Sequence, residues 1–419
     1  MPMPPTPHPQ TSTAWLNGVR GLAALIVAFV HFIAGEVDPP FSAFSAEPPH
    51  ENRRIYQLPP FRIIFADQAM VALFFVVSAY SISIGPLKAR ESTPRGNFLD
   101  SLSSSVFRRP IRLYMPVAVL EFLSHIAYYL NLYRWSSLPD EKLETLGDHI
   151  KHYFSYMLHL ANPFFPFQIA LNIQVWTIPA EFMGSCFVYL TILATANLRP
   201  AARLAVIVLI AVIAIWHLSW LLSTFMCGLA IAEYQLLQHT FISDSTRISR
   251  SRTQGLPLNS ALNTILFVLG FYLLCIPEHP ADDPWGSEYR IFSTIGPSLP
   301  SDQLPKAQMW RSIGGVMCMF ATSRSPTLQM LFNTRVAQYL GKISFGLYLV
   351  HILIFSLLRN ELVQLFWWVI GEDSVFGWIG AGAVLGPLVV WCGDLFWKVV
   401  DVRAVRLARW VDGRLRAQN

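Results

Sequence analysis

Apolar segments of about 20 residues recur along the whole chain, each bounded by polar or charged residues. A helix rises about 1.5 Å per residue, so ~20 apolar residues cross the ~30 Å hydrocarbon core of a bilayer. The pattern predicts ten such helices, over residues 17–35, 62–85, 110–131, 174–196, 201–217, 218–237, 259–276, 308–324, 343–359 and 375–397. We therefore expect an all-α polytopic membrane protein, a bundle of about ten transmembrane helices.

One further apolar stretch differs from these spans. Residues 150–168, IKHYFSYMLHLANPFFPFQ, are interrupted by His and Pro, which favours an interfacial or re-entrant helix. The remaining pattern predicts a disordered N-terminal tail over residues 1–16, a transmembrane domain over 17–400 and a basic C-terminal tail over 401–419. The N-terminal tail has no basic stretch before an apolar run, so we do not expect a cleaved signal peptide.

Composition supports a membrane protein. The chain is 53% hydrophobic and 14% charged, whereas a soluble domain carries about 25% charged residues. Its five cysteines lie in apolar stretches with a spacing that suits neither a zinc site nor a CxxC motif, so no metal is expected. No basic patch typical of nucleic-acid binding is present.

Charge is distributed unequally between alternate loops. Twenty of the 31 Lys and Arg residues fall in one set of loops and in the C-terminal tail, and 16 of the 26 Asp and Glu residues fall in the opposite set. Basic residues favour the cytosolic side of a membrane. We therefore expect both termini in the cytosol. The lack of a signal peptide and the even number of spans fit insertion into an internal membrane, which in a eukaryotic host we expect to be the endoplasmic reticulum.

Ionisable residues inside the predicted spans are candidates for function because they are costly in lipid. Arg20 begins the first span, and His31 follows eleven residues later, about 16 Å deeper and on the same helix face. Glu181 and Asp67 are expected at a depth similar to that of His31. A histidine beside a carboxylate can act as a general base. The alternative for each such residue is a polar contact that only holds two helices together.

A basic cluster, VFRRPIRLYMP at residues 106–116, begins the third span. Arg109 and Arg112 are three residues apart and share a helix face, and paired arginines can bind a phosphate group. The alternative is a topogenic anchor that holds anionic lipid headgroups.

Five motifs along the chain are together similar to those of a known family. They are WLNGVRGLAALIVAFVH at residues 15–31, FFVVSAYSIS at 74–83, RRPIR at 108–112, QVWTIPAEF at 174–182 and SFGLYLVH at 344–351. In this order they resemble the motifs of the acyltransferase 3 family of integral membrane acyltransferases. One position departs from the family pattern, because Ala79 stands where a glycine usually follows the serine.

The resemblance implies an O-acyltransferase that moves an acyl group, often acetyl, from acyl-CoA to an acceptor hydroxyl. It also implies a catalytic role for His31 and contacts from Arg20, Arg109 and Arg112 to the donor. Coenzyme A carries phosphates at one end and a thioester on a long arm at the other, which suits arginines at the cytosolic end and a histidine ~16 Å deeper.

The mechanism that we expect from these residues is general-base catalysis. His31, oriented by Glu181, removes the proton of the acceptor hydroxyl; alternatively, His31 is the nucleophile and forms an acyl-imidazole. The candidate oxyanion or substrate contacts are Tyr80, Trp176, His351, Ser78 and Asp67. Tyr80 and Trp176 could instead be interfacial aromatics, and His351 a helix-packing residue.

The acceptor is expected to be a small lipophilic alcohol, such as a terpenoid or polyketide natural product, reached from the bilayer or the cytosol. The alternative acceptor is a sugar on a lipid carrier. A second class of function stays open at this stage. A multi-span transporter or flippase could use buried His and Glu as a proton relay, but it would release no free coenzyme A. The oligomeric state is left open.

Overall fold

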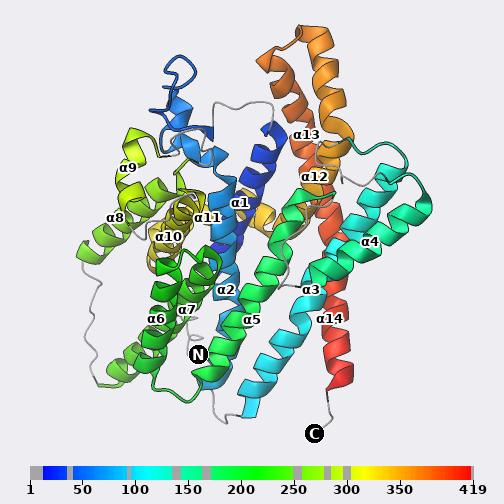
Figure 1. Ribbon diagram of the computed structural model, residues 1–419. Helices are drawn as coiled ribbons and strands as arrows, with labels where there is room; N and C mark the ends of the chain where they lie inside the picture. Colours follow the sequence, from blue (N-terminus) through cyan, green and yellow to red (C-terminus); the bar gives the residue numbers. More distant parts are fainter. Residues whose placement is uncertain are drawn as a thin grey trace, which may run out of the picture.

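The regular secondary structure of the described residues is all helical. The computed structural model describes residues 13–34, 41–91, 96–134, 143–162, 171–248, 257–277, 285–295 and 303–416, and no strand occurs within them. The helices, shown in Figure 1, are α1 Ala14–Ile33, η2 Ile55–Gln57, η3 Phe61–Phe65, α2 Asp67–Glu91, α3 Gly96–Tyr129, α4 Leu146–Ala161, η4 Ile173–Trp176, α5 Thr177–Ala194, α6 Pro200–Trp216, α7 Trp220–Ile248, α8 Pro257–Leu274, α9 Gly286–Thr294, α10 Gln303–Arg324, α11 Pro326–Phe332, α12 Arg335–Ile370, α13 Val375–Phe396, η5 Trp397–Asp401 and α14 Val402–Leu415.

Each of the ten predicted segments is helical, but a bundle of ten spans is not confirmed. Among the described residues, six helices are long and apolar enough to cross a membrane: Ala14–Ile33, Asp67–Glu91, Ile173–Ala194, Trp220–Gln238, Arg335–Ile370 and Val375–Leu415. Two further apolar helices, Pro200–Trp216 and Ser260–Leu274, are shorter than 18 residues. Helix α3 is long enough but carries several charged side chains, among them Arg109 and Glu121, that are buried in the bundle.

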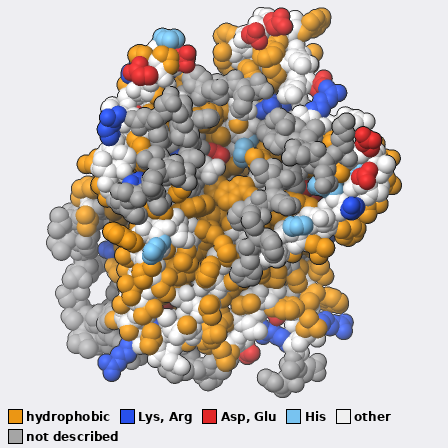
Figure 2. Space-filling view, in the orientation of Figure 1, with side chains coloured by type: hydrophobic (Ala, Val, Ile, Leu, Met, Phe, Trp, Pro, Cys, Tyr) orange, Lys and Arg blue, Asp and Glu red, His pale blue; other side chains and the backbone are white. Residues whose placement is uncertain are grey.

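The surface of the bundle has the character of a membrane protein. Figure 2 shows hydrophobic side chains over the middle of one face, with most charged side chains toward its two ends. Exposed aliphatic side chains such as Leu209, Val212 and Leu269 lie on helices at the periphery. Since lipid tails solvate apolar side chains, this surface requires no protein partner to cover it.

Helix α4 falls on the stretch for which an interfacial or re-entrant helix was predicted. It begins with a capping box in which Thr145 and Asp148 satisfy each other's backbone N–H groups. Its exposed side chains Leu146, Ile150, Phe154 and Leu158 are spaced four apart and form one apolar stripe. Residues 163–168 of the predicted stretch lie outside the described residues.

Helix α14 lies in the region where a basic tail was predicted. Helix α14 packs lengthwise against α3 (Figure 1), and Ala404 and Ala408 are buried in this contact. Asp412 accepts a hydrogen bond from Ser104 at 2.5 Å. Most of the predicted N-terminal tail, residues 1–12, lies outside the described residues.

The centre of the fold is the packing of α1 against α12 and α2. Gly21 on α1 and Gly341 on α12 bring the first two backbones into direct contact. A Cβ on Gly21 would overlap the backbone at Gly341, and a Cβ on Gly341 would overlap the carbonyl of Asn17. This close approach fixes the register in which α1 and α12 present their polar side chains to each other.

Candidate active site

His31 lies in a small polar group formed by three helices. Its Nδ1 atom is 2.9 Å from Nε2 of His351 on α12, and the two rings are stacked with centroids 5.1 Å apart. Its Nε2 atom is 4.0 Å from the carboxylate of Asp67, the first residue of α2. His351 is completely buried, whereas the His31 side chain retains 18% exposure. His31 is therefore the histidine of the pair that a substrate can reach.

Glu181 has partners other than His31. Its Oε1 atom accepts hydrogen bonds from Ser78 at 2.8 Å and from Arg109 at 2.6 Å. Arg109 also donates to Ser78 at 2.7 Å and to Ser185 at 3.0 Å. The structure brings Glu181 together with Ser78 and Arg109, two other predicted site residues, but the carboxylate that lies against His31 is Asp67. The predicted pairing of Glu181 with His31 is therefore not the arrangement in the structure, because the guanidinium of Arg109 holds this carboxylate.

A cavity of about 310 Å³ opens beside this second group. At one end it is lined by Arg20, Arg108, Arg112 and Asp401, and Ser78, Arg109 and Glu181 form part of its wall. Its apolar lining is given by Val71, Phe74, Phe75, Ile82, Leu113, Ile178, Phe345 and Tyr348. A volume of a few hundred Å³ is typical of a small-molecule site, and charged side chains as well as apolar ones line this cavity.

The arginines of the cavity differ in their partners. Arg109 is held by Glu181, and Nε of Arg108 lies 3.8 Å from Asp412. Neither Arg20 nor Arg112 forms an ion pair in the described part of the chain, although Asp401 lines the same cavity. These two guanidinium groups therefore have free donors for an anionic ligand.

The inner end of the cavity lies close to His31. Val71 on α2 is one helical turn from Asp67, and Tyr348 on α12 is one turn before His351. One turn corresponds to about 5.4 Å along a helix axis. The rings of Tyr348 and His351 have centroids 5.9 Å apart. The arginine-lined cavity thus leads toward the His31 group along two independent helices.

Two of the predicted contacts lie elsewhere. The hydroxyl of Tyr80 bonds to Gln235 of α7, and this tyrosine is buried in the α2–α7 contact. Trp176 packs edge-on against Trp220, with ring centroids 6.3 Å apart. Neither residue lines the cavity. Ala79, at the position of the usual family glycine, is fully buried and faces Gly228 of α7, which compensates for its methyl group.

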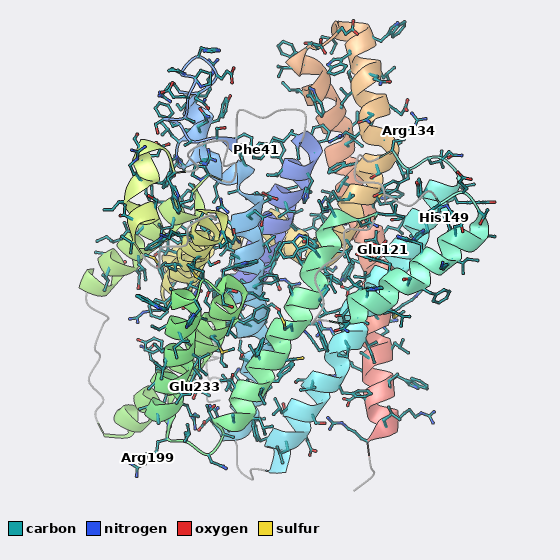
Figure 3. All side chains as sticks on the ribbon, viewed as in Figure 1. Phe41, Glu121, Arg134, His149, Arg199 and Glu233 are labelled. Atoms are coloured by element: carbon teal, nitrogen blue, oxygen red, sulfur yellow. The ribbon has the colours of Figure 1, made fainter. Side chains whose placement is uncertain are left out.

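Other buried ionisable residues hold helices together. Glu233 on α7 accepts hydrogen bonds from Arg90 at 2.7 and 2.8 Å and from Arg203 at 2.8 Å. Glu121 on α3 accepts one from Asn172 at 3.0 Å. Figure 3 labels both glutamates, which lie on different helices in different parts of the bundle. Their contacts fit the helix-packing alternative that the sequence left open.

Sequence reasoning did not single out Asp401, Arg108, Phe74 or Tyr348 as site residues. Asp401 is carried into the cavity by a π-helical turn, η5, that joins α13 to α14. Turns of this kind occur often at functional sites, but no residue pattern in the sequence predicts this one. Arg108 was visible in the basic cluster, and its place in the cavity follows from the packing of α3.

Comparisons with known proteins find one family over most of the chain. The model of the acyltransferase 3 domain family matches residues 13–398. The chain is 27% identical to O-acetyltransferase PaAT-1 of Phomopsis amygdali, over 96% of this chain and 85% of that protein. It is 23% identical to acyltransferase clz18 of Cochliobolus lunatus, over 87% of each chain. It is 21% identical to acyltransferase R4 of a Phoma species, over 92% of each. No solved structure gives a significant match.

The family match covers nearly the whole chain and includes every residue of the site described above except Asp401. The matched residues include the helix that carries Arg20 and His31, the arginine cluster of α3 and the helix that carries His351. The protein therefore belongs to the acyltransferase 3 family and is a membrane acyltransferase.

Proposed function

We propose that this enzyme transfers an acetyl group from acetyl-CoA to a hydroxyl of a small lipophilic acceptor. The observation that carries the proposal is the cavity and its two ends. Two arginines with free donors lie at one end, and His31, Asp67 and His351 lie one helical turn beyond the opposite end. The printed name of the Phomopsis relative, an O-acetyltransferase, supports acetyl as the group and oxygen as the acceptor atom.

The donor would lie along the cavity with its phosphates at the arginine end. Arg20 and Arg112 would bind the phosphates, since their guanidinium groups have free donors. Farther in, Glu181, Ser78 and Arg109 offer hydrogen-bonding groups to the amides of the pantetheine arm. The thioester would then reach the inner end, next to His31.

We assign the proton-bearing nitrogen of each ring in the histidine pair from its hydrogen-bond partners. Nδ1 of His351 lies 3.3 Å from the carbonyl of Leu347, so this nitrogen carries the proton and Nε2 is an acceptor. Nδ1–H of His31 then donates to His351, and Nε2 of His31 is left unprotonated. This Nε2 atom faces Asp67 and is the one that accepts the proton of a substrate.

The reaction then balances with His31 as both base and acid. Nε2 takes the proton of the acceptor hydroxyl while its oxygen bonds to the thioester carbonyl carbon. Asp67 stabilises the imidazolium that results, and His351 holds the ring in place. When the carbon–sulfur bond breaks, the proton passes from Nε2 to the thiolate, which releases free coenzyme A. The acyl-imidazole route remains the second form of this proposal.

The surroundings of His31 support a lipophilic acceptor. Phe32 and Phe355 pack against each other with ring centroids 5.7 Å apart, and Val27, Val30 and Ile352 belong to the same apolar core. An alcohol of the terpenoid or polyketide class suits such a site better than a free sugar does. We place the protein in the endoplasmic reticulum with the arginine-rich ends of its helices, and both termini, in the cytosol where acyl-CoA is made.

The test is acceptor-dependent release of free thiol from acetyl-CoA by the purified protein, across a panel of hydroxylated terpenoids, polyketides and sugars. Release with one of the lipophilic alcohols, together with the acetyl ester as product, is the expected result. Absence of thiol release with every acceptor, by protein that is folded and binds coenzyme A, would contradict the proposal. Family membership already favours the enzyme over the transporter alternative.

A further inference from the structure

Two aromatic side chains face each other at the inner end of the cavity. Phe74 on α2 and Tyr348 on α12 meet edge to face, with ring centroids 5.6 Å apart and planes at 70°. Both line the cavity, and His31 and Asp67 do not. A donor that enters at the arginine end therefore meets this pair before it reaches His31.

The two rings differ in how firmly they are held. The hydroxyl of Tyr348 lies 3.0 Å from Oγ1 of Thr177 and donates to the carbonyl of Gln174 at 3.1 Å. Nε2 of Gln174 in turn donates to the carbonyl of Leu349 at 2.7 Å, which ties η4 to α12. Phe74 has no polar group and is only half-buried. Tyr348 is therefore held in position, and the ring of Phe74 determines the width of the cavity at this point.

We propose that the Phe74–Tyr348 pair is a constriction that restricts the donor to narrow, unbranched acyl groups, with Phe74 as the residue that determines this selectivity. This inference rests on the proposed function, since it takes acyl-CoA to enter from the arginine end. The pantetheine arm is an unbranched chain, and an acetyl group is no wider than that arm. A branched or aromatic acyl group is wider and meets the edge of the Phe74 ring before its carbonyl reaches His31.

The experiment compares acetyl-CoA, isobutyryl-CoA and benzoyl-CoA as donors for the wild type and for Phe74→Ala, measured as kcat/KM with one acceptor. We expect the ratio of benzoyl to acetyl transfer to rise about tenfold or more in the variant, since removal of a steric block of this size is worth at least that factor. Phe345→Ala is the matched control. Phe345 lines the same cavity but lies one turn nearer the arginines, so its removal should leave the ratio at the wild-type value.

The following outcomes test the proposed role of Phe74. An unchanged donor ratio in folded Phe74→Ala that still uses acetyl-CoA would overturn the inference, and so would an equal rise in Phe345→Ala. If Phe74→Ala does not fold, Phe74→Leu keeps an apolar side chain and should still raise the isobutyryl ratio. Loss of transfer from every donor in both variants, with coenzyme A binding intact, would also overturn it. If the wild type itself transfers nothing from acyl-CoA, the proposed function fails instead.

Discussion

His31 and His351 lie 320 residues apart in the chain, yet Nδ1 of the first is 2.9 Å from Nε2 of the second and their rings are stacked. The contact exists because Gly21 and Gly341 allow α1 and α12 to touch along their backbones. In our account, His351 is a positioning residue that fixes both the ring orientation and the proton-bearing nitrogen of His31.

Replacement of His351 should therefore affect turnover and spare donor binding. We expect His351→Ala to lower kcat by roughly 10- to 100-fold, part of the factor that general-base catalysis contributes, with little change in KM for acetyl-CoA. His351→Gln retains an acceptor oxygen near the position of Nε2 and should recover part of the loss. Equal kcat values for the two variants would show that the hydrogen bond to His31 has no role.

The two carboxylates of the core should have separable roles. Asp67→Asn removes the charge beside His31, so kcat should fall by roughly 10- to 100-fold while the protein remains folded. Glu181→Gln instead weakens the contact to Arg109, which should lower the melting temperature and raise KM for the donor. Steady-state kinetics and thermal melting in detergent distinguish the two patterns. A fall in kcat for Glu181→Gln as large as that for Asp67→Asn would return Glu181 to the catalytic role predicted from sequence.

We expect Arg112 to contact only the phosphates of the donor and no other part of it. We expect Arg112→Ala to raise KM for acetyl-CoA by about 10- to 100-fold, the value of one strong charge-assisted hydrogen bond. Transfer from S-acetyl pantetheine, which lacks phosphates, should be unaffected. Arg409→Ala is the control, because Arg409 is exposed on α14 and does not line the cavity. Equal losses with both donors would place Arg112 in a structural role.

The contact between α1 and α12 can be tested through its glycines. Gly341→Ala would press a methyl group into the carbonyl of Asn17, and overpacking of this kind costs about 1–3 kcal/mol. We expect a lower melting temperature and loss of transfer, because the His31–His351 contact is displaced. A methyl group on Gly386 of α13 meets no atom within 4 Å, so Gly386→Ala should match or exceed the stability of the wild type. Similar melting temperatures for the two variants would contradict this packing.

Helix positions and the family were largely predictable from sequence, because they depend on local periodicity and on short motifs. Which side chains pair with one another was less predictable from sequence. His31, Asp67 and Glu181 were all identified, but which carboxylate lies against His31 depends on how α2 and α5 rotate about their axes. In the structure Ser78 and Arg109 bind Glu181, and Asp67 is the carboxylate beside His31.

A bundle of ten spans is not confirmed, because six helices of the described residues are long and apolar enough to cross a membrane. Helix α3 is not among these six, and neighbouring helices satisfy its buried Arg109, Glu121 and His125. The entry of Asp401 into the cavity depends on a local π-helical turn, which no periodic pattern encodes.

The most direct test of the central claim is thiol release from acetyl-CoA by wild type and His31→Ala, measured with the same acceptor and with coenzyme A binding determined in parallel. We predict that the variant binds coenzyme A like the wild type and releases no acceptor-dependent thiol above background. Retained turnover in folded His31→Ala would contradict the account, because the account makes Nε2 of His31 the base that takes the proton.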